Sequence, residues 1–251
     1  MAAASAVAVA AFVWLAGRHD PGGALRFRSQ GFEARTAGGF DVVSFSPAEV
    51  ELRLYWSDPG GKPLRTYAAL EQAVEADGRT LLAATNAGIF EPGLVPTGLY
   101  VQRGSTQRAL ERGRGRGNFY MRPNGVFFME GGRARVLETG EYAKASPHPG
   151  EATQSGPLLV RAGQLHPQLT PASGSLAIRS AIGVRADGAV VLAVSREEVN
   201  LYAAAAFMRD QERCPDALYL DGYISTLHVP AAKRPARQRY DYAGMIALLG
   251  R

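Results

Sequence analysis

Alternating apolar and polar positions predict a half-buried β-strand over residues 49–56. Apolar side chains there alternate with polar or amphipathic ones, at Val50, Leu52, Leu54 and Trp56 against Glu51, Arg53 and Tyr55. Since successive side chains of a strand point to opposite faces, this pattern places one face against a core. Two short apolar runs, residues 80–85 and 245–249, predict buried strands, the second of which closes the domain.

Two segments instead show the spacing of a helix with one apolar face. Residues 66–76 place Leu70, Ala73 and Val74 on one side and end at Asp77-Gly78, a common helix terminator. A second helix is predicted from Asn200, whose side chain can cap it, to about Gln211. Its core-facing residues are Leu201, Ala204, Ala205 and Met208.

Three glycine-containing turns predict hairpins between neighbouring strands. They are Glu130-Gly131-Gly132, Ala162-Gly163 and Asp187-Gly188, each beside short apolar runs. Hairpins join antiparallel strands, so antiparallel pairing should dominate the fold. The sequence therefore predicts an α+β fold, in which a curved, mostly antiparallel sheet is packed with a few helices.

The composition is that of one folded domain with many turns. The 251 residues are 46% hydrophobic and 20% charged, and they include 29 Gly and 15 Pro. A domain of this size buries roughly three quarters of its unfolded surface. Because no fixed-period repeat or internal linker is visible, we expect a single domain over residues 26–251.

The first residues form an apolar run that we expect to lie outside this domain. Residues 2–17 are apolar except for Ser5, too few for a comfortable helix across ~30 Å of hydrocarbon. A secretory signal fits better, although no basic residue precedes the run and Arg18 follows it. Residues 1–25 are therefore assigned to a signal or anchor segment with its linker, and the domain to an extracytoplasmic location, periplasmic or secreted. Membrane tethering through residues 2–17 is the alternative.

The net charge of +5 favours anionic partners such as phosphodiesters or acidic glycans. Arginines cluster at positions 103, 108, 112, 114 and 116, and basic residues recur over 233–239. No aromatic ladder or zinc-ligand spacing accompanies them, so we interpret these runs as solvated loops and expect no nucleic-acid partner.

Familiar catalytic signatures are absent from the sequence. It contains no H-E-x-x-H, no C-x-x-C, no P-loop and no nucleophile elbow around Ser155. The single cysteine, Cys214, excludes an intrachain disulfide, and the four histidines show no ligand spacing. These motifs therefore indicate no metal site and no cofactor, while the sequence leaves metal dependence open.

What remains is a series of short polar and glycine clusters at the ends of apolar stretches. Such loops on a rigid sheet commonly build sites, although turn chemistry explains any one of them taken singly. The clusters occupy residues 86–91, 96–100, 117–127, 154–157, 179–184 and 218–222.

Taken in this order, from about Phe40 to Leu249, the clusters resemble the phosphodiester glycosidase family, and most closely its bacterial exopolysaccharide-biosynthesis-like branch. The resemblance rests on the spacing of Asn86, Asn118, Gln154, Arg179 and Asp221. It implies a hydrolase that removes a sugar from a sugar-1-phosphodiester in an envelope or exported glycan. Two departures, Ala87 in place of a glycine and Tyr223 where glycine or serine is frequent, are expected to affect substrate choice.

A sugar-1-phosphodiester already has a good leaving group, so its hydrolysis depends on stabilising phosphate charge and an oxocarbenium-like centre. We assign Asp221 as the carboxylate near the anomeric carbon, acting as nucleophile or as base for water, and Glu91 as a second candidate. Arg179 and Arg122 are expected to pair bidentately with phosphate. The remaining substrate-binding candidates are Asn86, Asn118, Gln154, Ser155 and Gly222.

Two other functions fit the same residues. A non-catalytic module could bind an envelope glycan in this cleft without turnover. A scaffold for anionic lipid or nucleic acid predicts steep salt dependence and no discrimination among sugars. Turnover of a sugar-1-phosphodiester separates the enzyme from both, while the sequence leaves the sugar, its anomer and the oligomeric state open.

Overall fold

The computed structural model describes residues 23–233 and 238–250. The predicted signal or anchor segment falls almost entirely outside the described residues, so its role stays a prediction. Within the described ranges, no helix combines the length and the apolar character needed to cross a bilayer.

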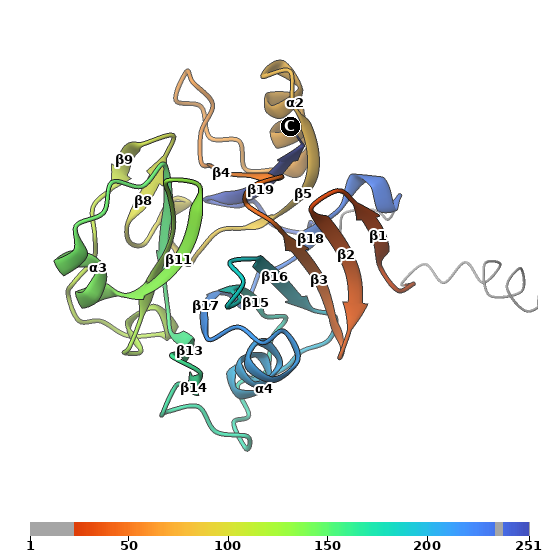
Figure 1. Ribbon diagram of the computed structural model, residues 1–251. Helices are drawn as coiled ribbons and strands as arrows, with labels where there is room; N and C mark the ends of the chain where they lie inside the picture. The colour runs from red at the N-terminus through yellow and green to blue at the C-terminus, as the bar shows by residue number, and fades with distance from the viewer. Residues whose placement is uncertain (1–22, 234–237, 251) are drawn as a thin grey trace, which may run out of the picture.

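The largest sheet has eight strands, with a helical segment packed on one face (Figure 1). Along β16, Val191 and Ala193 face that segment, while Leu192 and Val194 face the centre of the molecule. The covering segment consists of α4 (Leu201–Ala206) and the π-helix η2 (Phe207–Gln211). The strand order is β1 (Arg26–Ser29), β2 (Phe32–Ala37), β3 (Phe40–Phe45), β16 (Val190–Ser195), β15 (Ser180–Val184), β17 (Asp216–Asp221), β13 (Leu158–Arg161) and β14 (Gln164–Leu165).

A five-stranded sheet carries α3 (Thr139–Ala145) on its outer side. Tyr142 of α3 packs edge-on against Phe128, with ring centroids 5.2 Å apart. The strand order is β11 (Arg133–Glu138), β10 (Gly125–Glu130), β12 (Glu151–Ser155), β8 (Tyr100–Gln102) and β9 (Ser105–Arg108). The two-stranded pair β6 (Phe90–Glu91) and β7 (Val95–Pro96) precedes β8 in the chain. The short helix η1 (Asn118–Tyr120) lies between β9 and β10.

A four-stranded sheet is covered by α2 (Tyr67–Ala76), whose Leu70 and Val74 are buried against it. The helix begins where the sequence predicts, because the Thr66 side chain accepts a hydrogen bond from the Ala69 amide. The strand order is β18 (Leu227–His228), β5 (Thr80–Asn86), β19 (Met245–Gly250) and β4 (Glu51–Tyr55), and η3 (Pro230–Ala232) follows β18.

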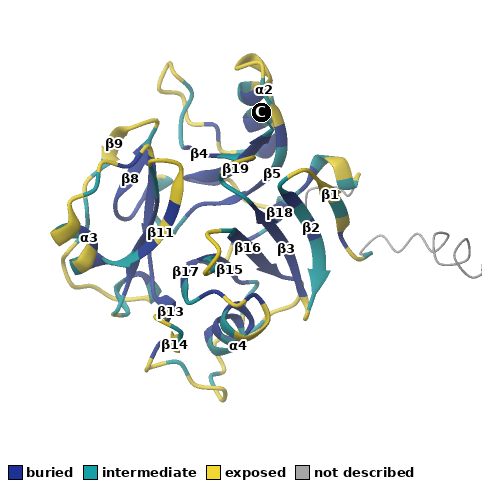
Figure 2. Ribbon diagram, viewed as in Figure 1, coloured by how far each residue is buried: buried dark blue, intermediate teal, exposed yellow. Residues whose placement is uncertain are grey.

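The inner faces of the three larger sheets share one hydrophobic core. Val43 and Leu192 from the first sheet meet Phe127 from the second and Leu54 and Ile246 from the third. In Figure 1 the helices α2, α3 and α4 lie on the outside, and in Figure 2 the strands between them are largely buried. This shared core makes the described chain a single domain, and it confirms the predicted α+β class.

All pairings between named strands of the described residues are antiparallel, as the hairpin turns predict. Each of the three predicted turns joins two paired strands. The strands are divided among four sheets, however, and do not form one curved sheet. The predicted helix from Asn200 is also different, since it widens after Ala206 and the Glu212 amide donates five residues back to the Phe207 carbonyl at 3.1 Å.

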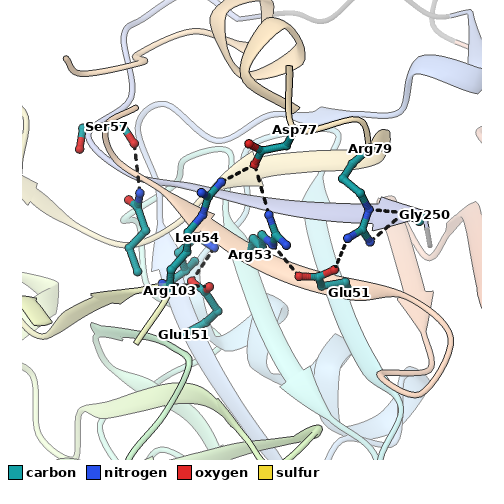
Figure 3. A network of polar contacts seen from close by, with 10 residues as sticks. Glu51, Arg53, Leu54, Ser57, Asp77, Arg79, Arg103, Glu151 and Gly250 are labelled. Atoms are coloured by element: carbon teal, nitrogen blue, oxygen red, sulfur yellow. Dashed lines mark hydrogen bonds and ion pairs between the residues drawn. The ribbon is translucent and has the colours of Figure 1, made fainter. Parts of the chain in front are cut away.

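A buried carboxylate joins the five-stranded sheet to the four-stranded sheet (Figure 3). Glu151 accepts hydrogen bonds from the amides of Leu54, at 2.9 Å, and Arg103, at 3.1 Å. Burial raises the pKa of the Glu151 carboxyl to about 7, and the two amides and the nearby Arg53 and Arg103 charges lower it only in part. Glu151 therefore titrates near neutrality while it bridges two sheets.

The free energy of unfolding should fall as pH rises from about 5 to 7. In this range Glu151 is still protonated in the folded chain, whereas in the unfolded chain a glutamate, with a pKa near 4.3, has lost its proton. We expect Glu151→Gln to flatten this slope, a difference on the order of 2 kcal/mol in the free energy of unfolding across the window. Urea denaturation at several pH values measures it. Glu75→Gln, at an exposed position of α2, should keep the wild-type slope, whereas an unchanged slope in Glu151→Gln contradicts the assignment.

Candidate active site

A pocket of about 430 Å³ gathers residues that are far apart in the sequence. Five of the predicted site residues line it, from β6, η1, the residue before β15 and the end of β17. The five are Glu91, Asn118, Arg179, Asp221 and Gly222. A carboxylate and a guanidinium thus share one cavity. No single sequence cluster predicts this arrangement, because the residues come from different parts of the chain.

Asp221 is the last residue of β17 and is only 6% exposed. Its Oδ1 accepts hydrogen bonds from the amides of Tyr223, at 2.7 Å, and Ile224, at 3.3 Å. Burial raises the pKa of the Asp221 carboxyl, and the amides and the Arg179 charge lower it only in part. The carboxylate is therefore fixed in orientation and more basic than an exposed one.

Arg179 is 4% exposed, and protein groups already occupy most of its donors. Nε donates to the Val199 carbonyl at 3.2 Å, and Nη1 donates to the Tyr219 hydroxyl at 2.8 Å. Nη2 donates to the carbonyl and the hydroxyl of Ser175. A guanidinium has five N–H groups, so within the described residues one N–H of Nη1 is left. The predicted bidentate pairing with phosphate is not available in this arrangement, and Arg179 offers its charge and a single donor.

Gly222 is required because the chain approaches two side chains closely. A Cβ atom at this position would overlap the Tyr219 hydroxyl and Nη1 of Arg179. Tyr219 was not among the predicted site residues, yet it lines the pocket and takes hydrogen bonds from both Arg179 and Asn118. Burial raises the pKa of Tyr219 to about 12, so its hydroxyl stays neutral. Asn118 and Arg179 together hold this hydroxyl against the backbone at Gly222.

Asn86 supports the site from behind and is not one of the residues that line the pocket. Its Nδ2 donates to the Ser180 hydroxyl at 3.0 Å. The same hydroxyl accepts from the Asp221 amide at 3.2 Å, and the nearby Ser225 hydroxyl donates to the Asp221 carbonyl at 2.9 Å. Asn86 thereby positions the backbone that carries Asp221. The sequence had instead suggested that Asn86 contacts the sugar or the phosphate directly.

Ser155 and Gln154 have structural partners too, and neither lines the pocket. The Ser155 hydroxyl donates to the Leu220 carbonyl at 3.0 Å, just before Asp221. Gln154 accepts from the amides of Leu99 and Glu111 and donates to the Glu111 carbonyl at 2.7 Å. The interpretation of Gln154 as a substrate ligand is therefore not supported, because buried backbone groups occupy its amide.

Arg122 also lies outside the residues that line the pocket. Its Nη2 donates to the carbonyls of Arg112, at 2.7 Å, and Gly113, at 2.6 Å, and so stabilises the arginine-rich loop. Exposed Arg116 of that loop does line the pocket. The loop interpreted from sequence as merely solvated thus supplies the second cation of the site, with Arg122 supporting it.

The two carboxylates of the pocket differ in environment. Glu91 is exposed on the short strand β6, whereas Asp221 is buried at the end of β17. Among the described residues, no group of three or more His, Cys, Asp or Glu side chains is arranged to hold a metal ion. The pocket thus combines one buried carboxylate of raised pKa with the guanidinium groups of Arg179 and Arg116 in its lining.

The sequence model of the phosphodiester glycosidase family matches residues 79–246, a span that contains all the site residues described above. The chain belongs to the phosphodiester glycosidase family. The chain is also similar to the uncharacterized protein YigE of Escherichia coli (strain K12), with 31% identity over 207 residues that cover 82% of this chain and 80% of YigE.

Solved structures share the phosphodiester glycosidase fold at low sequence identity. One is the catalytic domain of zebrafish N-acetylglucosamine-1-phosphodiester alpha-N-acetylglucosaminidase, auto-inhibited by its pro-peptide, with a TM-score of 0.61 at 16% identity over 88% of this chain and 78% of that one. Another is a hypothetical protein from Synechocystis, with a TM-score of 0.53 at 16% identity over 90% of this chain and 61% of that one. At these identities the likeness establishes the fold, and the chemistry has to be argued from the pocket.

Proposed function

We propose that this chain is a hydrolase that releases a sugar from a sugar-1-phosphodiester, with a phosphate monoester as the second product. The observation that carries the proposal is that the Asp221 carboxylate and the Arg179 guanidinium line the same pocket. Membership of the phosphodiester glycosidase family supports it, as does the name of the zebrafish relative, which specifies an N-acetylglucosamine-1-phosphodiester.

In this proposal, the bond between the anomeric carbon and the bridging oxygen breaks, and water supplies the new anomeric hydroxyl. The departing phosphate monoester is a weak base, so it needs charge stabilisation more than a proton. Arg179 and Arg116 provide positive charge in the pocket for that purpose. Asp221 faces the anomeric carbon, and its raised pKa makes it an effective base at neutral pH.

Asp221 can act in two ways that give different products. Direct attack forms a glycosyl-enzyme intermediate and retains the configuration at the anomeric carbon, with a second carboxyl such as Glu91 assisting water. If Asp221 instead activates water, the configuration at the anomeric carbon is inverted in one step. Following the first-formed anomer by NMR distinguishes the two routes.

The activity itself is tested with matched substrates. Purified protein is given the methyl phosphodiester of α-N-acetylglucosamine 1-phosphate and the p-nitrophenyl α-glycoside of the same sugar, and the released sugar is measured. We expect preference for the phosphodiester. Glucose and galactose 1-phosphate diesters extend the series to other sugars. Binding of these diesters without turnover contradicts the proposal and favours the glycan-binding module.

We also propose that the substrate is an envelope or exported glycan outside the cytoplasm. Two features support this, the apolar run at residues 2–17 and the net positive charge, which attracts polymeric phosphodiesters. Fractionation of cells that produce the C-terminally tagged full chain tests it. Recovery of the folded chain in the cytoplasmic fraction alone contradicts the location.

A further inference from the structure

Two exposed tyrosines form a pair at the candidate active site. Tyr223, which lines the pocket, is 76% exposed, and Tyr240 is 48% exposed. Their ring centroids are 5.1 Å apart and the rings are tilted by 33°. Within the described ranges, Leu176 is the one other large hydrophobic side chain with comparable exposure. Two of the three most exposed large apolar surfaces therefore meet beside Asp221, and such a concentration marks a binding surface.

The backbone beneath this pair is held in place. The Tyr223 amide donates to Oδ1 of Asp221, and the Tyr240 carbonyl accepts from Nε2 of Gln238 at 2.9 Å. Gln238 also donates to the Arg65 carbonyl at 2.8 Å, which ties its segment to the start of α2. Both rings are thus displayed in solvent from an anchored backbone, so a ligand that stacks on them does not have to order a loose loop first.

The position of the pair relative to the pocket indicates which part of a substrate it contacts. The sugar and phosphate that react must lie near Asp221, Arg179 and Arg116 inside the pocket. Tyr223 and Tyr240 are mostly in solvent, so they can contact what extends out of the pocket, namely the alcohol on the far side of the phosphate.

We propose that Tyr223 and Tyr240 form a subsite that stacks against a carbohydrate ring on the far side of the phosphodiester. The C–H face of a pyranose is apolar, and the two tilted rings present an angled surface that fits a puckered ring better than a flat base. A hydrogen bond between the two tyrosine side chains holds the rings in this arrangement. This inference rests on the proposed function and assigns Tyr223 and Tyr240 as the residues that determine specificity for the leaving alcohol.

The test compares two diesters of α-N-acetylglucosamine 1-phosphate that differ only in the leaving alcohol. One carries methanol and the other carries the 6-hydroxyl of methyl glucoside. We expect the wild-type chain to have the higher kcat/KM for the glucoside diester. Tyr223→Ala and Tyr240→Ala should each lower that preference by roughly 2- to 12-fold, because an aromatic stacking contact contributes about 0.5–1.5 kcal/mol.

Two control variants separate stacking from other effects. Tyr223→Phe keeps the ring and the backbone amide on Asp221, so it should keep most of the preference. Tyr202→Ala, on α4 and outside the residues that line the pocket, should leave both substrates unaffected. A preference that is unchanged in both alanine variants overturns the subsite even when the diesters are hydrolysed.

Binding measurements keep the inference testable without turnover. If neither diester is hydrolysed, the proposed function fails, and calorimetry with the glucoside diester still tests the subsite. Weaker binding in Tyr223→Ala supports it, and equal binding overturns it. UDP-N-acetylglucosamine serves as a third ligand. If it binds more tightly than the glucoside diester and loses that advantage in Tyr223→Ala, the pair recognises a base and the carbohydrate assignment is wrong.

Discussion

Asp221→Asn is expected to lower kcat/KM for a sugar-1-phosphodiester by roughly 10²-fold or more while the fold is kept. The asparagine Oδ1 can still accept the hydrogen bonds from the amides of Tyr223 and Ile224, so the loop after β17 should keep its shape. What is lost is the negative charge near the anomeric carbon, which neither nucleophilic attack nor water activation can do without. Kinetics with the methyl diester, together with thermal unfolding of both proteins, measures this.

The pH profile gives an independent measure of the same carboxylate. Activity requires ionised Asp221, and burial raises its pKa, so wild-type kcat/KM should fall as pH decreases through that raised pKa. The small residual activity of Asp221→Asn should lack this acidic limb.

Asp216→Asn is the matched control, because Asp216 begins the same strand, accepts the Ala162 amide at 2.9 Å and lies outside the residues that line the pocket. It should retain activity. An active Asp221→Asn combined with an inactive Glu91→Gln would move the role to Glu91 and leave the family membership intact.

Local features of the fold could be predicted from sequence, because their causes are local. Thr66 and Asn200 cap helices through bonds to amides three residues ahead, and the turns at Gly131 and Gly188 join strands that are adjacent in the chain. The division of strands among sheets could not be predicted. β17 lies between β15 and β13, and that order depends on contacts across the shared core, which no local pattern encodes.

The site was predicted where a polar residue and a glycine follow an apolar strand, as at Asp221-Gly222. Tyr219 was missed because a tyrosine inside an apolar strand is usually core. Ser180 was missed because its hydroxyl does not line the pocket and acts through Asn86 and Asp221. Gln154 was assigned to the substrate because its backbone partners are about 40 to 55 positions away, where a sequence shows no connection. Tertiary hydrogen bonding, more than residue type, decides which polar side chains face the pocket.

Arg179→Lys is expected to lower kcat/KM for the phosphodiester by roughly 10²-fold, about the effect of removing one donor to a developing oxyanion. Lysine keeps the positive charge but lacks the planar fork that spans the Val199 carbonyl, Ser175 and the Tyr219 hydroxyl, so the charge and the free N–H should shift. If Arg179 stabilises the phosphate, Arg179→Lys should lower kcat/KM about tenfold less for the p-nitrophenyl glycoside, because that substrate has no phosphate. Thermal unfolding determines how much of the loss is due to destabilisation.

Ser175→Ala provides the comparison variant for this experiment. It removes the hydroxyl that accepts from Nη2 of Arg179 and leaves the stronger bond to the Ser175 carbonyl at 2.8 Å, so the guanidinium should stay in place and activity should change little. Equal losses on the phosphodiester and the aryl glycoside in Arg179→Lys would mean that Arg179 acts only by holding Tyr219 against Gly222. In that case Arg116, the other cation that lines the pocket, is left to stabilise the phosphate, and Arg116→Ala should then show the selective loss on the phosphodiester.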